Sequence, residues 1–284
     1  MARVSTALDE VRRRLEALNR APLPPSVVAG SELPAVVPFD PAERTLERQL
    51  PGEVITCDAG RAYLIRRIVG EVEPDLRNIA AGVSRAVESR HAGEGVLDGD
   101  EAVAASDLLF FDIETCGFSG TPLFLIGLLF VDGGVLRVEQ LLARTYAEEA
   151  AILSGFRDRH AVRRHLVTFN GKAFDWPFVR DRAAAARIKL ASDRPHTDLL
   201  HAARRVYRDT LPDCRLQTLE RHFCGRTRVG DIAGFDIPAA YHNFVESGDA
   251  RRLKAIAYHN YLDLVTMAEL LAVLRTADTH RTAV

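Results

Sequence analysis

The stretch from Phe110 to Thr115 constrains this chain more than any other. It continues an apolar run that begins at Leu108, and it contains two acids one residue apart, Asp112 and Glu114. Side chains alternate between the faces of a strand, so both acids point the same way. Two like charges at the end of a buried strand are costly unless a cation lies between them. Paired carboxylates suit Mg²⁺ or Mn²⁺; the alternative is a strand end with two solvated acids.

A further acid follows a second short apolar strand, His165 to Phe169. Asn170 comes at the end of this strand, Gly171 permits a sharp turn, and Asp175 falls in the first turn of the next helix. An acid at that position is also favoured by the helix dipole alone. The segment therefore supplies either a further metal ligand or a simple N-terminal charge.

The third acidic segment lies in the last long helix. His259 and Asp263 are four residues apart and share one helix face, whereas Tyr258 points well away from it. The alternative is a solvated His–Asp pair on the surface. Four carboxylates, Asp112, Glu114, Asp175 and Asp263, suffice to hold two divalent ions about 4 Å apart, the arrangement used for in-line phosphoryl displacement. His259 is then the candidate general base for the attacking water, since its ordinary pKa suits that task.

Composition limits the other classes of protein. A chain of 284 residues with 47% hydrophobic residues has room for a full core, and its net charge of −2 gives no global basic field. The four cysteines form no CxxC pair, which argues against a disulfide scaffold or a zinc ribbon. Residues 1–20 carry charges throughout and have no apolar signal region, and no apolar run is long enough to span a bilayer. We expect a cytoplasmic protein with no membrane association.

The order of the expected elements predicts a mixed α/β fold. A helix over Ser5–Arg20, a proline-rich arm over Ala21–Pro41 and a hairpin with strands Glu53–Cys57 and Arg61–Ile68 form an N-terminal extension. Three strands in an antiparallel meander and then alternating helices and strands follow. Thr145 and Glu148 resemble a capping box at the first of these helices. The expected division is 1–103 for the extension, 104–276 for the main domain and 277–284 for a tail.

Three motifs in this order resemble those of a known superfamily. D-I-E-T, N-x-x-x-F-D and H-N-x-x-D are similar to the motifs of DEDD-type 3′–5′ exonucleases with the ribonuclease H-like fold. Further likeness to the YprB-like branch lies in Leu125–Gly127, Asp198–Leu200, Leu216–Glu220 and the stretch from Gly230 to Tyr241. The resemblance implies a mixed five-stranded sheet flanked by helices, with Asp112, Glu114, Asp175 and Asp263 as ligands of two Mg²⁺ or Mn²⁺ ions.

One departure from the superfamily concerns the candidate general base. The familiar subclasses place a His five residues, or a Tyr four residues, before the last Asp, whereas this chain has Tyr258 and His259 at those two positions. Helix geometry favours His259. Asp198 is a further acid, which we expect to be structural.

Substrate contacts are expected from several further side chains. Thr115, Asn170 and Lys172 are candidates for contacts with the nucleotide, and Phe174 and Trp176 for stacking on a base, with a place in the core as the alternative for Phe174. Arginines that cluster in sequence form either a basic groove or a solvated surface: Arg204, Arg205, Arg208, Arg215, Arg221, Arg226 and Arg228.

The expected function is therefore a metal-dependent 3′–5′ exonuclease that hydrolyses single-stranded DNA or RNA. Two alternatives stay open: an endonuclease with the same fold, and a non-catalytic nucleic-acid-binding or scaffold protein that retains it.

Overall fold

The computed structural model of the chain describes residues 41–88, 97–98, 103–118, 120–191 and 194–281, with side chains up to Leu274. The chain divides into two units, Met1–Phe39 and Asp40–Val284, and everything below concerns the second. The helix expected over Ser5–Arg20 and almost all of the proline-rich arm lie outside the described residues.

One sheet of seven strands runs through this unit, in the order β1-β2-β5-β4-β3-β6-β7. The strands are β1 Glu53–Cys57, β2 Gly60–Ile68, β3 Leu108–Thr115, β4 Leu123–Asp132, β5 Val135–Leu142, β6 His165–Thr168 and β7 His196–Asp198. In this spatial order, each neighbouring pair from β1 through β2, β5 and β4 to β3 is antiparallel. β6 pairs parallel with β3, and β7 pairs parallel with β6. The mixed α/β fold and its antiparallel meander are therefore confirmed.

The expected number of strands was too low. The five strands of the prediction are β3 to β7, and the hairpin adds two more, because β2 pairs with β5 from Tyr63 opposite Leu142 to Ile68 opposite Arg137. An exposed strand edge offers unpaired N–H and C=O groups to any suitable strand, and β2 satisfies them on β5. Leu64 and Ile65 on β2 are buried, so the hairpin is part of the core of this fold.

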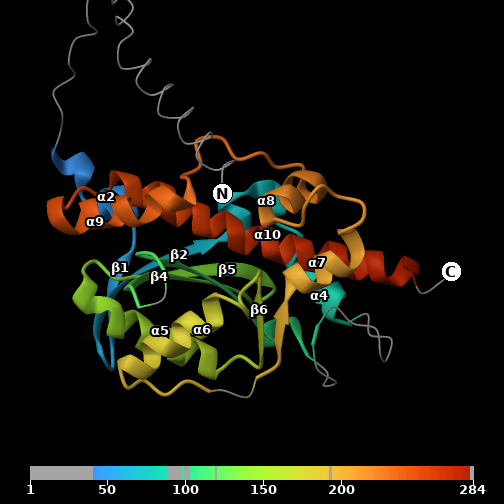
Figure 1. Cartoon of the computed structure of the whole chain (residues 1–284), viewed down its shortest axis with the longest axis horizontal. Coiled ribbons are helices and arrows are strands. Elements are labelled where there is room, and N and C mark those ends of the chain that lie inside the picture. The colour runs from blue at the N-terminus through green and yellow to red at the C-terminus, as the bar shows by residue number, and fades with distance from the viewer. Residues whose placement is uncertain (1–40, 89–96, 99–102, 119, 192–193, 282–284) are drawn as a thin grey trace, which may run out of the picture. The chain divides into compact units, whose positions relative to one another are not determined.

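Helices cover both faces of the sheet (Figure 1). Their bounds are α2 Leu46–Gln49, α3 Val69–Val72, α4 Ile79–Glu88, α5 Glu149–Ala161, α6 Asp175–Ala185, α7 Leu199–Tyr207, α8 Leu216–Leu219, α9 Ile237–Ser247 and α10 Arg251–Arg281. Short 3₁₀ turns are η1 Pro41–Arg44, η2 Pro74–Leu76, η3 Ala105–Asp107, η4 Tyr146–Glu148 and η6 Gly234–Asp236, and η5 Glu220–Cys224 is a π-helical turn. Among the described residues, no helix is both long and apolar enough to cross a membrane.

Alternation along β3 divides the core into two layers. Leu109 and Phe111 belong to the cluster that includes Phe156 of α5, whereas Leu108 and Phe110 belong to the cluster that includes Leu264 in the middle of α10. Asp112 and Glu114 follow Leu108 and Phe110 on the same face of the strand. β3 therefore presents both acids on the face that α10 crosses.

The start of α5 differs from the expected capping box. The Thr145 side chain makes no cap hydrogen bond, and η4 precedes the helix. Glu148 Oε2 instead accepts from the Arg144 backbone N–H at 2.8 Å, and its carboxylate pairs with the Arg144 guanidinium. The nearby cation gives Glu148 a stronger partner than the Thr145 N–H.

Candidate active site

The acids of β3 are held against α10 by an amide. Asn260 Nδ2 donates to Asp112 Oδ2 at 2.8 Å, and Asn260 Oδ1 accepts from Gln140 Nε2 at 2.7 Å. Asn260 and Gln140 are fully buried. The Glu114 carboxylate, in a residue that is 9% exposed, makes no hydrogen bond or ion pair with another described residue.

A glycine makes room for this amide. A Cβ on Gly127 of β4, the residue opposite Asp112, would lie 2.0 Å from Asn260 Oδ1. The sequence contains a signal for this contact, since Gly127 interrupts an otherwise apolar strand. Likeness to the family singled out Gly127 and Asn260, but it did not predict that they hold Asp112.

A tight turn after β6 delivers Asp175 to the same place. The Ile113 backbone N–H donates to Asp175 Oδ1 at 3.2 Å, which ties the first residue of α6 to β3. The turn is shaped by Asp198, whose carboxylate accepts from the N–H groups of Asn170 at 2.8 Å and Lys172 at 3.1 Å. Asn170 itself has a φ of 62°. Asp198 therefore has the structural role that we expected.

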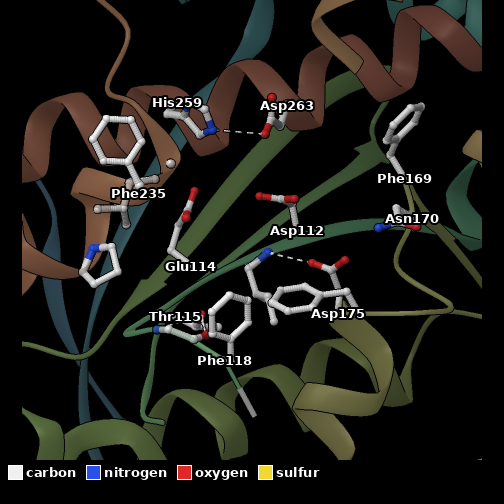
Figure 2. Close-up of a pocket in the computed structure, with 16 residues that line it drawn as sticks. Asp112, Glu114, Thr115, Phe118, Phe169, Asn170, Asp175, Phe235, His259 and Asp263 are labelled. Carbon is white, nitrogen blue, oxygen red and sulfur yellow. Dashed lines mark hydrogen bonds and ion pairs between the residues drawn. The ribbon is translucent and has the colours of Figure 1, made fainter. Parts of the chain in front are cut away.

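The α10 residues His259 and Asp263 face the acids of β3, as Figure 2 shows. His259 Nε2 lies 3.5 Å from Asp263 Oδ2, and His259 Nδ1 lies 2.8 Å from Asp231 Oδ1. Tyr258 is 46% exposed, and its hydroxyl donates to Glu73 at 3.4 Å. His259 thus lies in the pocket, whereas Tyr258 is directed elsewhere.

Two partners of the α10 residues were missed from the sequence. Asp231 holds His259, and Arg228 Nη2 lies 2.6 Å from Asp263 Oδ1. Both come from the loop between α8 and α9. The only available signal was the likeness of the Gly230–Ile232 stretch to the family, because spacing along the chain does not connect this loop to α10.

These segments surround a pocket of about 630 Å³. It is lined by Asp112, Ile113, Glu114, Thr115, Gly117, Phe118, Phe169, Asn170, Phe174, Asp175, Gly234, Phe235, Ile237, Pro238, His259 and Asp263. The phenylalanines Phe118 and Phe235 are 88% and 85% exposed at its rim. Among the described residues that line the pocket, none is a lysine or an arginine.

The candidate substrate residues separate into two groups. Thr115 and Asn170 line the pocket, as does Phe174. Lys172 does not line it and pairs with Asp98 at 2.5 Å. Trp176 packs edge-on against the buried ring of Phe111, with ring centroids 6.4 Å apart, so the expectation that it faces a base is wrong.

The basic cluster expected around residues 204–228 also divides. Arg226 and Arg228 are not groove residues: both form ion pairs with the buried Glu220 of η5, at 2.8 and 2.7 Å, and their side chains are 20% and 5% exposed. Burial of Glu220 requires a cationic partner, and these two side chains satisfy it. Arg204, Arg205, Arg208, Arg215 and Arg221 are exposed or half-buried, so a groove role stays a prediction for them.

The carboxylates of the four pocket acids repel one another when they are ionised. Burial first, and then repulsion by Asp263 and Asp175, raise the pKa values of Asp112 and Glu114 well above their ordinary range. Burial likewise raises the pKa of Asp175 to about 7. Burial also raises the pKa of Asp263, although Arg228 and His259 act in the opposite direction. A cation that entered the pocket would offset the free-energy cost of ionising these buried acids.

The donor set fits a hard divalent ion. Carboxylate oxygens with no competing soft ligand suit Mg²⁺ or Mn²⁺, and Glu114 has no cationic partner among the described residues. Among the residues that the structure describes, no three His, Cys, Asp or Glu side chains converge closely enough to hold a metal ion. The fit therefore rests on the chemistry and burial of the acids.

Comparison with known proteins identifies the family. A family model described as the RNase_H superfamily matches residues 109–275, which include every acid of the pocket. The chain belongs to the RNase_H superfamily. It has the RNase H-like fold of nucleases, and the expected likeness to the YprB-like branch is confirmed by the relative described next.

Two similar proteins extend this result. "Uncharacterized protein YprB" of Bacillus subtilis (strain 168) is 34% identical over 170 residues, which cover 58% of this chain and 41% of that protein. The family B DNA polymerase of Pyrobaculum calidifontis has a similar fold, with a TM-score of 0.50 and 20% identity over 59% of this chain and 24% of the polymerase. The chain thus spans less than half the length of either protein, and the likeness to the polymerase concerns the fold alone.

Proposed function

We propose that this member of the RNase_H superfamily is a metal-dependent nuclease, a 3′–5′ exonuclease that hydrolyses single-stranded DNA or RNA. The observation that carries the proposal is one pocket lined by four carboxylates and a histidine from three separate segments. The raised pKa values of Asp112, Glu114 and Asp175 support it, because acids in such a state gain most from a bound cation. The 3′–5′ direction rests on the resemblance of the three motifs.

In the proposed mechanism, Asp112, Glu114, Asp175 and Asp263 hold two Mg²⁺ or Mn²⁺ ions. Bound ions of this kind lower the pKa of a coordinated water and stabilise the leaving oxygen of a phosphodiester. His259 accepts the proton of the attacking water at Nε2, because Nδ1 is engaged by Asp231. Asn260 holds Asp112 in place.

The aromatic rim supports a single-stranded substrate. Phe118 and Phe235 present faces on which an unpaired base can stack, and such stacking contributes about 1–3 kcal/mol per base. A base within a duplex is already stacked and paired and cannot use those faces. Thr115 and Asn170, which also line the pocket, are proposed to contact the terminal nucleotide.

End-labelled oligonucleotides test the activity. Wild-type protein with Mg²⁺ or Mn²⁺ should shorten single-stranded DNA or RNA stepwise from the 3′ end. Asp112→Asn and Asp175→Asn should lower the rate by at least about 10³-fold, because each removes a proposed metal ligand. The matched control is Asp181→Asn, which alters an exposed acid on the same helix as Asp175 and should leave the rate unchanged.

A circular single strand and a 3′-blocked strand complete the experiment. Cleavage of the circle would replace the exonuclease proposal by an endonuclease. Full activity of both Asp112→Asn and Asp175→Asn would refute the site, and binding without any cleavage would favour a scaffold protein.

Substitutions at two adjacent residues test which side chain is the general base. His259→Gln should lower kcat by about 10²–10⁴-fold, the usual contribution of a general base, and Tyr258→Phe should change it little. Tyr258 is the matched control, since it adjoins His259 on α10 but donates to Glu73 instead of lining the pocket. The opposite pattern in single-turnover rates would move the base to Tyr258.

A further inference from the structure

Arg228 is a buried cation directly beside the pocket acids. Its side chain is 5% exposed, and its three guanidinium nitrogens each engage a different carboxylate. Nε lies 2.7 Å from Glu220 Oε2, Nη2 lies 2.6 Å from Asp263 Oδ1, and Nη1 lies 3.4 Å from Asp231 Oδ2. Arg228 does not line the pocket, so it acts on the site through these acids.

Arg228 and His259 share two carboxylate partners. Both side chains contact Asp263, and both contact Asp231, each through a different oxygen of the carboxylate. Asp263 Oδ1 is occupied by Arg228, which leaves Oδ2 as the oxygen on the His259 side. The planar guanidinium fixes both acids at once, and an ammonium group, as a single point charge, cannot reproduce that geometry.

From this geometry we infer that Arg228 is a positioning residue and a permanent counter-cation for the metal site. It restricts Asp263 to one free oxygen, aligns His259 through Asp231, and offsets one unit of acidic charge before any divalent ion binds. The inference rests on the proposed function, because it presumes that Asp263 is a metal ligand.

The two roles have separable consequences. A fixed positive charge close to a cation site weakens cation binding, so removing it should tighten binding. The orientation of ligands and base affects turnover, and losing a residue that orients a metal ligand typically costs about 10–100-fold in metal affinity or activity. Because Arg228 also carries the charge that repels the metal, we assign this cost to kcat. Loss of Arg228 should therefore move metal affinity and kcat in opposite directions.

Metal binding is measured without nucleic acid, by calorimetric titration of the whole protein with MnCl₂. Arg228→Met should bind Mn²⁺ more tightly, by roughly three- to tenfold for the loss of one charge, while its kcat on a labelled oligonucleotide falls by about 10–100-fold. Arg228→Lys keeps the charge and loses the planar fork. It should retain the wild-type Mn²⁺ affinity and still show the lower kcat.

Arg226→Met is the matched control. Arg226 shares Glu220 with Arg228 but pairs with Glu269 instead of Asp263. Its loss should lower the melting temperature without changing Mn²⁺ affinity or kcat. A purely structural role of Arg228 would give the same pattern for both Met variants.

Other outcomes are equally decisive. Weaker or unchanged Mn²⁺ binding by Arg228→Met would overturn the counter-cation role, and wild-type kcat in Arg228→Lys would overturn the positioning role. If Arg228→Met does not fold, its refolding in MnCl₂ but not in NaCl supports the counter-cation role, and failure in both contradicts it. Wild-type protein that binds Mn²⁺ yet cleaves no nucleic acid would contradict the proposed function alone.

Discussion

Three of the four acids of the pocket are each held by a different kind of partner. Asp112 accepts from the Asn260 amide, Asp175 accepts from a backbone N–H of β3, and Asp263 pairs with Arg228. Glu114 has none of these contacts within the described part of the chain. Neutral donors stabilise a buried carboxylate less than a cation does. Without metal, Asp112, Glu114 and Asp175 are therefore expected to favour their protonated forms.

This expectation predicts how the stability of the metal-free protein depends on pH. The pKa of Asp175 is raised to about 7, so the protonated carboxyl stabilises the fold at low pH and that contribution is lost as pH rises through 7. In EDTA, the free energy of unfolding should fall between pH 5 and pH 8, by up to about 1.4 kcal/mol per pH unit for each such group. Urea denaturation across this range measures the slope.

Asp175→Asn should show a shallower slope than the wild type, and Asp181→Asn should show the wild-type slope. Stability that rises with pH in EDTA would contradict the raised pKa values.

At the scale of elements, the site depends on how closely α10 approaches β4. Asn260 lies over Gly127, and its amide joins Gln140 of β5 to Asp112 of β3. One buried side chain thus links three strands to the helix that carries His259 and Asp263. Any residue larger than glycine at position 127 would occupy the space of the amide.

We predict that Gly127→Ala destabilises the protein by about 1–3 kcal/mol, the usual cost of overpacking a core, and lowers nuclease activity by displacing Asn260 from Asp112. Gly82→Ala on α4 is the control, because a Cβ there would lie 3.6 Å from the Ala272 Cβ, an ordinary contact. It should stabilise the helix by about 0.5–1 kcal/mol. Equal unfolding free energies for the two variants would contradict this packing.

For the whole molecule, the hairpin decides where the folded unit begins. β2 pairs with β5 along its length, and Tyr63, Leu64 and Ile65 are buried in the same core as α5. The division at residue 103 came from the glycine- and aspartate-rich composition of residues 91–106, and it stays a prediction. The sheet itself continues across that division.

A pair of truncations tests the boundary. A chain of residues 104–284 should be insoluble or markedly less stable, because β5 loses its partner strand and apolar side chains of the sheet become exposed. A chain of residues 41–284 keeps the hairpin and the whole sheet, so it is the matched control and should remain folded. Urea denaturation followed by circular dichroism compares the two chains, and a stable 104–284 chain would support the division at residue 103.

Local patterns in the sequence were enough to predict most of the sheet and the series of acids. Apolar runs located β3 to β6, and alternation set Asp112 and Glu114 on one face of β3, because both depend on local periodicity. The spacing of His259 and Asp263 similarly fixed their common helix face.

The surroundings of those acids depend on tertiary contacts. These contacts bring Arg228 and Asp231 from a distant loop to α10, pack Trp176 against Phe111, and join the hairpin to β5. These contacts connect residues far apart in the chain, and they depend on packing and on the pairing of buried charges. Neither leaves a periodic pattern in a single sequence.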